Sequence, residues 1–364
     1  MLDEIKSVLK EHPGLTGRDI GRKIDKKKSE VNSFLSKSSD GLYQEDWKWY
    51  IKPSDEIVFH IRCASWLTCE EFENNYSLIG DLVNAKESKV IVVFPKGFRV
   101  LIIAGARIIA LINQLEYKGK HVVLNFENCK KSMGYLNRLG FFDHIHERVE
   151  IIPSRPKISR AKQYKGNSKN IVEIGNIDLN DFNEELPEEL TAAFTHHAGE
   201  EYYMAAFTVF SELIGNVEDH SETPIHGFAA LQFYHGRKKH IQTVISDHGL
   251  GLSNTLKSNL KQHYPELAAS LNMKSIDSDM ELIEKALTEG KLSRFGHNPE
   301  KIARGLGLKR SQDYALKYNA EITIRQDSFL IKLIFQKGKL VDSIKRKNLE
   351  LLAGTHVCFD FILD

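Results

Sequence analysis

The segment ELIGNVEDHS, from Glu212 to Ser221, places polar side chains one helical turn apart, at the end of a stretch whose apolar residues recur at helical spacing. Glu212 and Asn216 are spaced i, i+4, so they share one face of the predicted helix with Cβ atoms ~5–6 Å apart. His220 extends this row by one more turn. A carboxylate and an amide in such a row can orient a water or hold a hydrated Mg²⁺. An ordinary exposed helix face has the same pattern, so the neighbouring segments must decide between the two interpretations.

Two glycine-containing segments follow in the chain. SDHGLGL places Asp247 at the end of an apolar strand, where its carboxylate can accept a hydrogen bond from an exocyclic amine, and Gly249 and Gly251 let the main chain approach a ligand closely. RGLGLKRSQDYALKYN opens a predicted helix whose first N–H groups can bind phosphate. Its candidate residues are Gly305, Gly307, Leu308 and Lys309. Taken alone, each segment is equally consistent with an ordinary glycine turn.

The order of these motifs resembles that of the GHKL family of ATPases and kinases. Glu212 to Asn216 is similar to the N box of that family, Asp247 to Gly251 to its first glycine box, and Gly305 to Leu308 to its second. GTHVCFDFIL resembles its closing strand. The likeness covers roughly residues 195 to 364. It implies a Bergerat-type α/β sandwich, in which a mixed sheet is covered by helices on one face.

The resemblance also implies roles for single residues, with ATP and Mg²⁺ as cofactors. Asn216 would hold the Mg²⁺ that bridges the phosphates, and Glu212 would be the general base or would position the attacking water. Asp247 would accept from adenine N6, with Thr355 supporting it through a water. The insert between the two glycine boxes would be a lid over ATP. The other implied ATP-binding residues are His220, Gly249, Gly251, Gly305, Gly307, Leu308 and Lys309.

Length and composition bound the remaining possibilities. A chain of 364 residues with 41% hydrophobic residues is long enough for two or three folded domains. The net charge of +1 gives no global attraction to nucleic acid or membrane, so such binding needs a local patch. The four cysteines form no Cys-x-x-Cys pair, which argues against structural zinc and for a reducing compartment. With no signal peptide and no apolar run long enough to span a bilayer, we expect a cytoplasmic protein without membrane contact.

We expect an α+β multi-domain protein with four segments. Residues 1–53 predict three helices and a hairpin and resemble a Zα-type winged helix. Residues 55–152 alternate strands and helices and resemble a STAS-like α/β domain. Residues 153–170 predict a linker whose six basic residues either are merely solvated or contact phosphate. Residues 171–364 form the GHKL-like domain.

The first segment supplies the candidate nucleic-acid contacts. The winged-helix resemblance places Lys28, Asn32 and Trp49 on a phosphate-contacting face. The sequence departs from the Zα pattern at Ser36, where that family has tyrosine, so contact with ordinary duplex is the expectation. A winged helix that contacts another protein is the alternative. The basic candidates are Arg18, Arg22, Lys26, Lys27 and Lys28.

These features together predict an ATPase that acts as a conformational switch and is coupled to nucleic-acid or partner binding. We expect a homodimer, as in the GHKL relatives, and a partner protein docked on the STAS-like domain. Two alternatives stay open. One is a protein Ser/Thr kinase of the anti-sigma type, and the other is a DNA-binding regulator that senses ATP without turnover.

Overall fold

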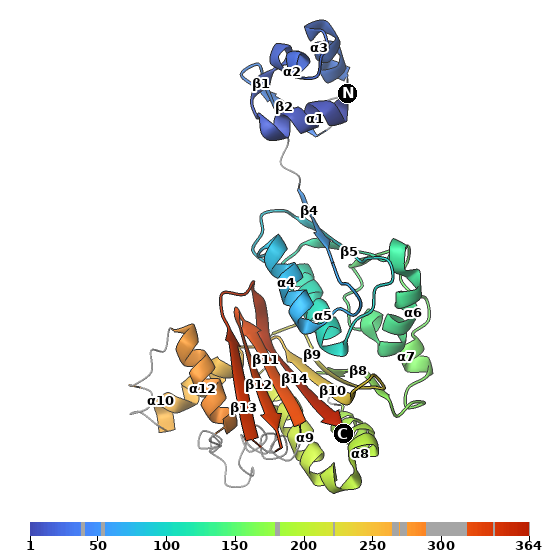
Figure 1. Ribbon diagram of the computed structural model, residues 1–364, viewed down its shortest axis with the longest axis vertical. Helices are drawn as coiled ribbons and strands as arrows, with labels where there is room; N and C mark the ends of the chain where they lie inside the picture. The colour runs from blue at the N-terminus through green and yellow to red at the C-terminus, as the bar shows by residue number, and fades with distance from the viewer. Residues whose placement is uncertain are drawn as a thin grey trace. The chain divides into compact units, whose positions relative to one another are not determined.

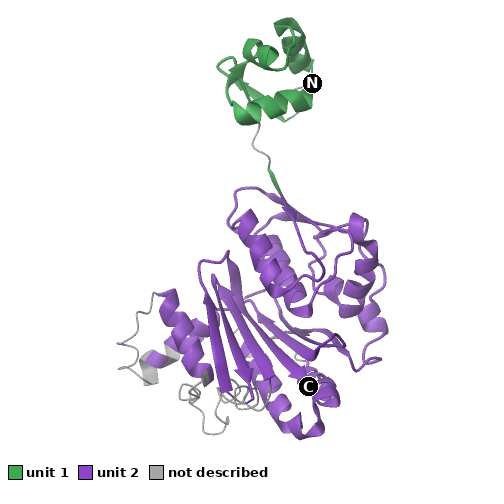
Figure 2. Ribbon diagram, viewed as in Figure 1, with its two compact units in different colours: residues 1–57 green, residues 58–364 purple. Residues whose placement is uncertain are grey.

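The structure is a computed structural model (Figure 1). It describes residues 1–37, 41–51, 55–178, 183–220, 223–263, 269, 275–288, 319–337 and 339–363. The chain divides into two compact units, Met1–Ile57 and Val58–Asp364 (Figure 2).

The first unit consists of three helices and three short strands. In chain order these are α1 (Leu2–Glu11), β1 (Leu15–Thr16), α2 (Gly17–Lys23), α3 (Lys28–Lys37), β2 (Leu42–Glu45) and β3 (Lys48–Ile51). The strands pair antiparallel in the order β1-β3-β2. The sequence predicts a helix cap at Thr16, directly before GRDIGRKI, and in the structure the Thr16 hydroxyl accepts a hydrogen bond from the backbone N–H of Asp19. A small core holds the unit together and consists of Ile5, Leu9, Ile20, Val31, Leu35 and Leu42.

The hairpin of this unit differs in one respect from the sequence expectation. In GLYQEDWKWYIK, Leu42, Trp47, Trp49 and Ile51 alternate with polar residues, which predicts Trp47 and Trp49 on the same inward face of a hairpin. Trp49 does pack against the small core. Trp47 lies in the turn between β2 and β3 with positive φ and is 83% exposed. Because Asp46 and Trp47 form the two-residue turn, Trp47 belongs to neither strand and the inward alternation does not extend to it.

The first part of the second unit has the predicted alternation of strands and helices. Its elements are β4 (Glu56–His60), α4 (Cys69–Ile79), β5 (Lys89–Val93), α5 (Ile102–Tyr117), β6 (His121–Asn125), η1 (Glu127–Cys129), α6 (Lys130–Leu139), η2 (Phe141–Asp143), β7 (Glu150–Ile152) and α7 (Arg160–Gln163). The four strands form one sheet in the order β4-β5-β6-β7, in which β5, β6 and β7 are parallel.

The segment predicted as a basic linker is attached to this layer. It contains α7, whose Ala161 is buried. The guanidinium of Arg155 donates hydrogen bonds to four backbone carbonyls, those of Phe142, Ile145, His146 and Val149. Lys165 forms an ion pair with Glu189. At least these two of the six basic side chains are therefore engaged within the chain.

The rest of the second unit is built on a seven-stranded sheet. Its strands are β8 (Ile171–Ile177), β9 (Gly227–Tyr234), β10 (Lys239–Asp247), β11 (Asn319–Asp327), β12 (Phe329–Gln336), β13 (Lys339–Arg346) and β14 (Leu352–Leu363), in the order β13-β12-β11-β14-β10-β9-β8. The helices of this part are α8 (Leu186–Ala198), η3 (Glu200–Tyr202), α9 (Tyr203–His220), α10 (Leu252–His263) and α12 (Ile276–Thr288). Every strand pair in this sheet is antiparallel, so the expectation of a mixed sheet was wrong.

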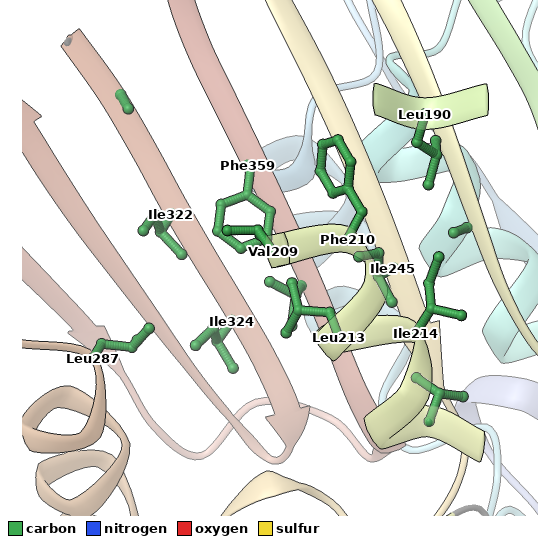
Figure 3. Close-up of a cluster of buried hydrophobic side chains, with 14 of the residues drawn as sticks. Leu190, Val209, Phe210, Leu213, Ile214, Ile245, Leu287, Ile322, Ile324 and Phe359 are labelled. Carbon is green, nitrogen blue, oxygen red and sulfur yellow. The ribbon is translucent and has the colours of Figure 1, made fainter. Parts of the chain in front are cut away.

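Both faces of the seven-stranded sheet are covered, although the sequence predicted helices on one face only. Helices α8, α9, α10 and α12 share one apolar core with alternate residues of the central strands, among them Ile245, Ile324 and Phe359 (Figure 3). Helix α5 packs against β9, β10 and β14 on the opposite face. Both faces of the central strands are apolar, and β9 and the middle of β10 are accordingly buried at nearly every position. Among the described residues, no helix combines the length and apolar character needed to cross a bilayer.

Candidate functional site

One end of the seven-stranded sheet carries a row of three polar residues from neighbouring strands. Asp247 is the last residue of β10 and is paired with Thr355 of β14, which is paired in turn with Gln326 of β11. Residues in one register row point to the same face of a sheet. This face is the one that α8, α9, α10 and α12 cover, because Ile245, Ile324 and Val357, in the row two positions away, belong to the core beneath these helices.

The turn from Asp247 to Ser253 is fastened to this row by hydrogen bonds. A carboxylate oxygen of Asp247 accepts from the Gly249 N–H at 2.9 Å. The Thr355 hydroxyl accepts from the Leu252 N–H at 2.9 Å. Gln326 accepts from the Ser253 N–H at 3.1 Å and donates to the Ser253 hydroxyl at 2.6 Å. Leu252 and Ser253 open α10, so these side chains satisfy N–H groups that lack a partner within the helix.

Glycine is required at two positions around the turn. Gly251 has φ +83°, and a Cβ added there would lie 2.6 Å from the amide nitrogen of Gln326. Gly354 has φ +88° and is pressed against the main chain of Asp247. Both conformations lie in the left-handed region, which disfavours residues with side chains. The φ of Gly249 does not lie in that region.

Helix α9 brings the predicted Glu212 and Asn216 to the same face. Its buried residues Leu213 and Val217 contact the sheet, and Glu212 and Asn216 directly precede them and are partly buried. One carboxylate oxygen of Glu212 is shielded from solvent. A Cβ added to Gly227 would lie 2.5 Å from Val217 and 2.9 Å from the carbonyl oxygen of Ser246. The last turns of α9 therefore lie beside the strand end that carries Asp247.

Two histidines lie behind the row, on the face that α5 covers. His248 and His356 are both buried, with ring centroids 5.7 Å apart. Burial lowers the pKa of His248 to about 4. Burial also lowers the pKa of His356, and the neighbouring His248 adds to this effect. Both rings are thus neutral near pH 7 and act as packed polar groups in this position.

A buried ion-pair cluster connects the α4–α5 layer to the row. Glu73 of α4 accepts from Arg107 of α5 at 2.7 Å and from Arg325 of β11 at 3.1 Å. All three side chains are buried. Arg325 also donates to the carbonyls of Asp327 and Glu350. Burial lowers the pKa of Arg325, and the opposing charge of Glu73 acts against this shift.

The sequence interpretation missed Gln326, Gln114 and this cluster. One signal for Gln326 was available, because Ile322 and Ile324 alternate inward along β11 and Gln326 takes the next inward position. No local pattern marks Gln114, since it lies in a helix that is buried almost all round. Its partner, Ala353, is distant in the sequence.

Several predicted site residues lie outside the described part of the chain. These are the whole second glycine segment, with Gly305, Gly307, Leu308 and Lys309, and the side chain of His220 at the end of α9. Of the predicted lid, the structure describes α10 and α12.

The candidate nucleic-acid residues all lie in the first unit. Arg18, Arg22, Lys26, Lys27 and Lys28 are exposed, at and between α2 and α3. Asn32 is also exposed, but its side-chain oxygen lies so close to Gly17 that a Cβ there would be 1.9 Å away. Trp49 is only partly exposed, because it packs against the small core.

No group of three or more His, Cys, Asp or Glu side chains suited to a metal ion occurs within the residues that the structure describes. Comparison with protein-family models, with curated proteins and with solved structures found no match.

Proposed function

We propose that the chain binds Mg²⁺–ATP at Asp247 and Thr355, beside the turn that Gln326 holds, and hydrolyses ATP as a conformational switch. One observation carries the proposal: Asp247 ends a strand opposite Thr355, at the glycine turn and on the sheet face that is covered by α9, the helix of Glu212 and Asn216. The proposal is supported by three of the four motifs, because their elements, α9, β10 and β14, are neighbours although the motifs are spread over more than 140 residues. The resemblance to GHKL proteins predicts this convergence.

Asp247, Thr355 and the two constrained glycines each have a task in this proposal. The Asp247 carboxylate accepts a hydrogen bond from the exocyclic amine of adenine. Thr355 faces it across the strand pair, at a Cβ separation of ~4.5–5.5 Å that a bridging water can span. The Thr355 oxygen accepts from Leu252, so its own proton remains available for that water. Gly251 and Gly354 leave the main chain open where a side chain would intrude.

The α9 residues fit the metal and the chemistry that the resemblance implies. Mg²⁺ retains several waters and takes phosphate oxygens, so one amide oxygen from Asn216 is a sufficient protein ligand. Such a site needs no cluster of acidic or histidine ligands. Bound Mg²⁺ neutralises phosphate charge during phosphoryl transfer. Glu212, one turn before Asn216 and partly shielded from solvent, accepts a proton from the attacking water or orients it.

The partner side of the switch is assigned to the first unit. Its order of helices and strands agrees with a winged helix, and its exposed basic residues suit duplex phosphates. A docked partner protein on the STAS-like layer and a homodimer complete the proposed switch.

Nucleotide selectivity tests the binding half of this proposal. The full chain with Mg²⁺ should bind ATP at least about tenfold more tightly than GTP, because GTP offers a carbonyl where adenine offers an amine. Asp247→Ala should lose this preference. Asp342→Ala, an exposed carboxylate on β13, is the matched control and should keep it. Failure of the wild-type chain to bind adenine nucleotide at millimolar concentration would overturn the proposal.

Labelled ATP separates the three possible outcomes of binding. Release of free phosphate identifies an ATPase, which we propose. Transfer of label to the chain or to an added protein identifies a kinase of the anti-sigma type. Retention of intact ATP identifies a regulator that senses the nucleotide without turnover.

A further inference from the structure

Gln326 holds one side of the turn after β10. Its side chain is fully buried and forms two hydrogen bonds to Ser253, one to the backbone N–H and one to the hydroxyl. Its amide nitrogen occupies the space into which a Cβ at Gly251 would project. Gln326 therefore fixes the turn both by hydrogen bonds and by packing.

Gln114 holds the other side of the turn through an irregularity in β14. Gln326 is paired with Thr355, but the next residue of β11, Asp327, is paired with Leu352. Ala353 and Gly354 are thus left out of the ladder, and their main-chain groups need other partners. For Ala353 these partners come from the Gln114 side chain, which accepts from the Ala353 N–H at 2.9 Å and donates to the Ala353 C=O at 3.0 Å. The next residue, Gly354, lies against Asp247.

Both amides are tied to the layer formed by α4 and α5. Gln114 is itself a residue of α5. Gln326 directly follows Arg325, whose guanidinium is bound by Glu73 of α4. Because these side chains are buried and hydrogen-bonded, none can move without leaving a polar group unpaired. A rearrangement of α4 and α5 must therefore reach the turn.

We propose that Gln326 and Gln114 are positioning residues for the nucleotide site, through which the α4–α5 layer sets the affinity of the site. This role rests on the proposed function. The two amides do not touch the reacting groups. They hold the turn and the β14 irregularity in the shape that places Asp247 opposite Thr355.

A matched pair of glutamine variants tests the proposal. Gln326→Met removes the hydrogen bonds to Ser253 at similar side-chain length. Gln242→Met is the control, because Gln242 is also buried and bonds a side chain, Asp360, but lies five residues before Asp247 on β10. Both variants should unfold at lower urea concentration. Only Gln326→Met should raise the Kd and KM for ATP, by about tenfold, while kcat stays within about twofold. Equal effects on Kd in both variants would overturn the proposal.

Two further variants extend the test. Gln114→Met should raise the Kd for ATP although Gln114 lies on the face of the sheet opposite the site; an unchanged Kd would remove Gln114 from the proposal. Ser253→Ala keeps the backbone bond to Gln326 and removes only the hydroxyl bond. Ser253→Ala should therefore raise the Kd for ATP, but by less than Gln326→Met does. Should Gln326→Met fail to fold, Ser253→Ala alone decides: a Kd equal to that of the wild type would overturn the role of Gln326.

Hydrogen exchange in the absence of nucleotide distinguishes failure of this inference from failure of the proposed function. The amides of Leu252 and Ser253 should be protected in the wild-type chain and should exchange at least about tenfold faster in Gln326→Met, with little change in Gln242→Met. If exchange is faster in Gln326→Met but the wild-type chain does not bind ATP, Gln326 does position the turn and the proposed nucleotide binding is wrong. Unchanged exchange would refute the positioning itself.

Discussion

Gly354 of β14 lies directly against the main chain of Asp247, so that a Cβ added to Gly354 would be 2.0 Å from the Asp247 carbonyl oxygen. No side chain fits at this distance without moving the strand end. The contact makes the position of Asp247 dependent on a residue more than 100 positions away in the chain. It also makes the strand end sensitive to single substitutions.

Gly354→Ala should destabilise the fold by about 2–4 kcal/mol, because it adds both left-handed strain and a clash with the main chain. Urea unfolding of the full chain measures this loss. Gly97→Ala is the control, since Gly97 has φ +73° but nothing within 4 Å of the added Cβ, so strain alone should cost about 1 kcal/mol. Equal losses in the two variants would show that the strand end yields to the clash.

Glu73→Ala should cost about 3–5 kcal/mol of stability, because it leaves the buried guanidiniums of Arg107 and Arg325 without their shared carboxylate. The comparison is Glu281→Ala, which removes an i, i+4 pair with Lys285 on α12 and should cost no more than about 0.5 kcal/mol. Similar unfolding midpoints for the two variants would contradict the importance assigned to the buried cluster.

The stability of the chain should fall as the pH is lowered from 6.5 towards 4, in part because of His248. Burial lowers the pKa of His248 from 6.5 to about 4, so in this window the unfolded chain binds a proton that the folded chain does not. Unfolding is thereby favoured, by up to about 3 kcal/mol at the acidic end. His248→Gln should show a shallower dependence in urea unfolding at pH 7 and pH 4.5. Parallel pH dependences for wild type and variant would refute this contribution.

Glu212→Ala should abolish release of phosphate from ATP and leave nucleotide affinity within about threefold, because the carboxylate acts on the water and not on the nucleotide. Asn216→Ala provides the contrast and should lose the Mg²⁺-dependent part of ATP binding. Titration with ATP, with and without Mg²⁺, distinguishes the two residues. If both variants lose turnover but keep Mg²⁺-dependent ATP binding, the metal role of Asn216 is wrong.

Replacing Arg18, Lys27 and Lys28 together by alanine should weaken duplex binding and flatten its dependence on salt. The log–log slope should become shallower by ~0.9 for each phosphate that the variant no longer neutralises. Lys10→Ala, on the exposed side of α1, should leave the slope unchanged. Fluorescence anisotropy with a labelled duplex between about 50 and 200 mM salt measures both slopes, because affinity for duplex can fall by about 10³–10⁵ over this range. Undetectable binding by the wild type at low salt would remove nucleic acid from the proposed switch.

The sequence by itself determined many of the local elements of this protein. Apolar patterns in the sequence predict α5, α9, β5, β6 and β10. Burial of one face leaves apolar residues every 3.6 positions in a helix and every 2 positions in a strand, and burial of both faces leaves a continuous apolar run. Turn chemistry placed the cap at Thr16. The periodicity did not reveal β13, whose residues are mostly exposed and therefore lack an apolar pattern, and the prediction also passed over β8 and α8.

Only the tertiary structure decided which residues meet. Pairing of Asp247 with Thr355 and of Thr355 with Gln326 depends on strand register, which joins segments far apart in the chain. The covering of the second sheet face by α5, and the hydrogen bonds of Gln114 to Ala353, depend on packing between layers. Periodicity shows that a side chain is buried but not against what, because a long-range contact leaves no repeat in the sequence.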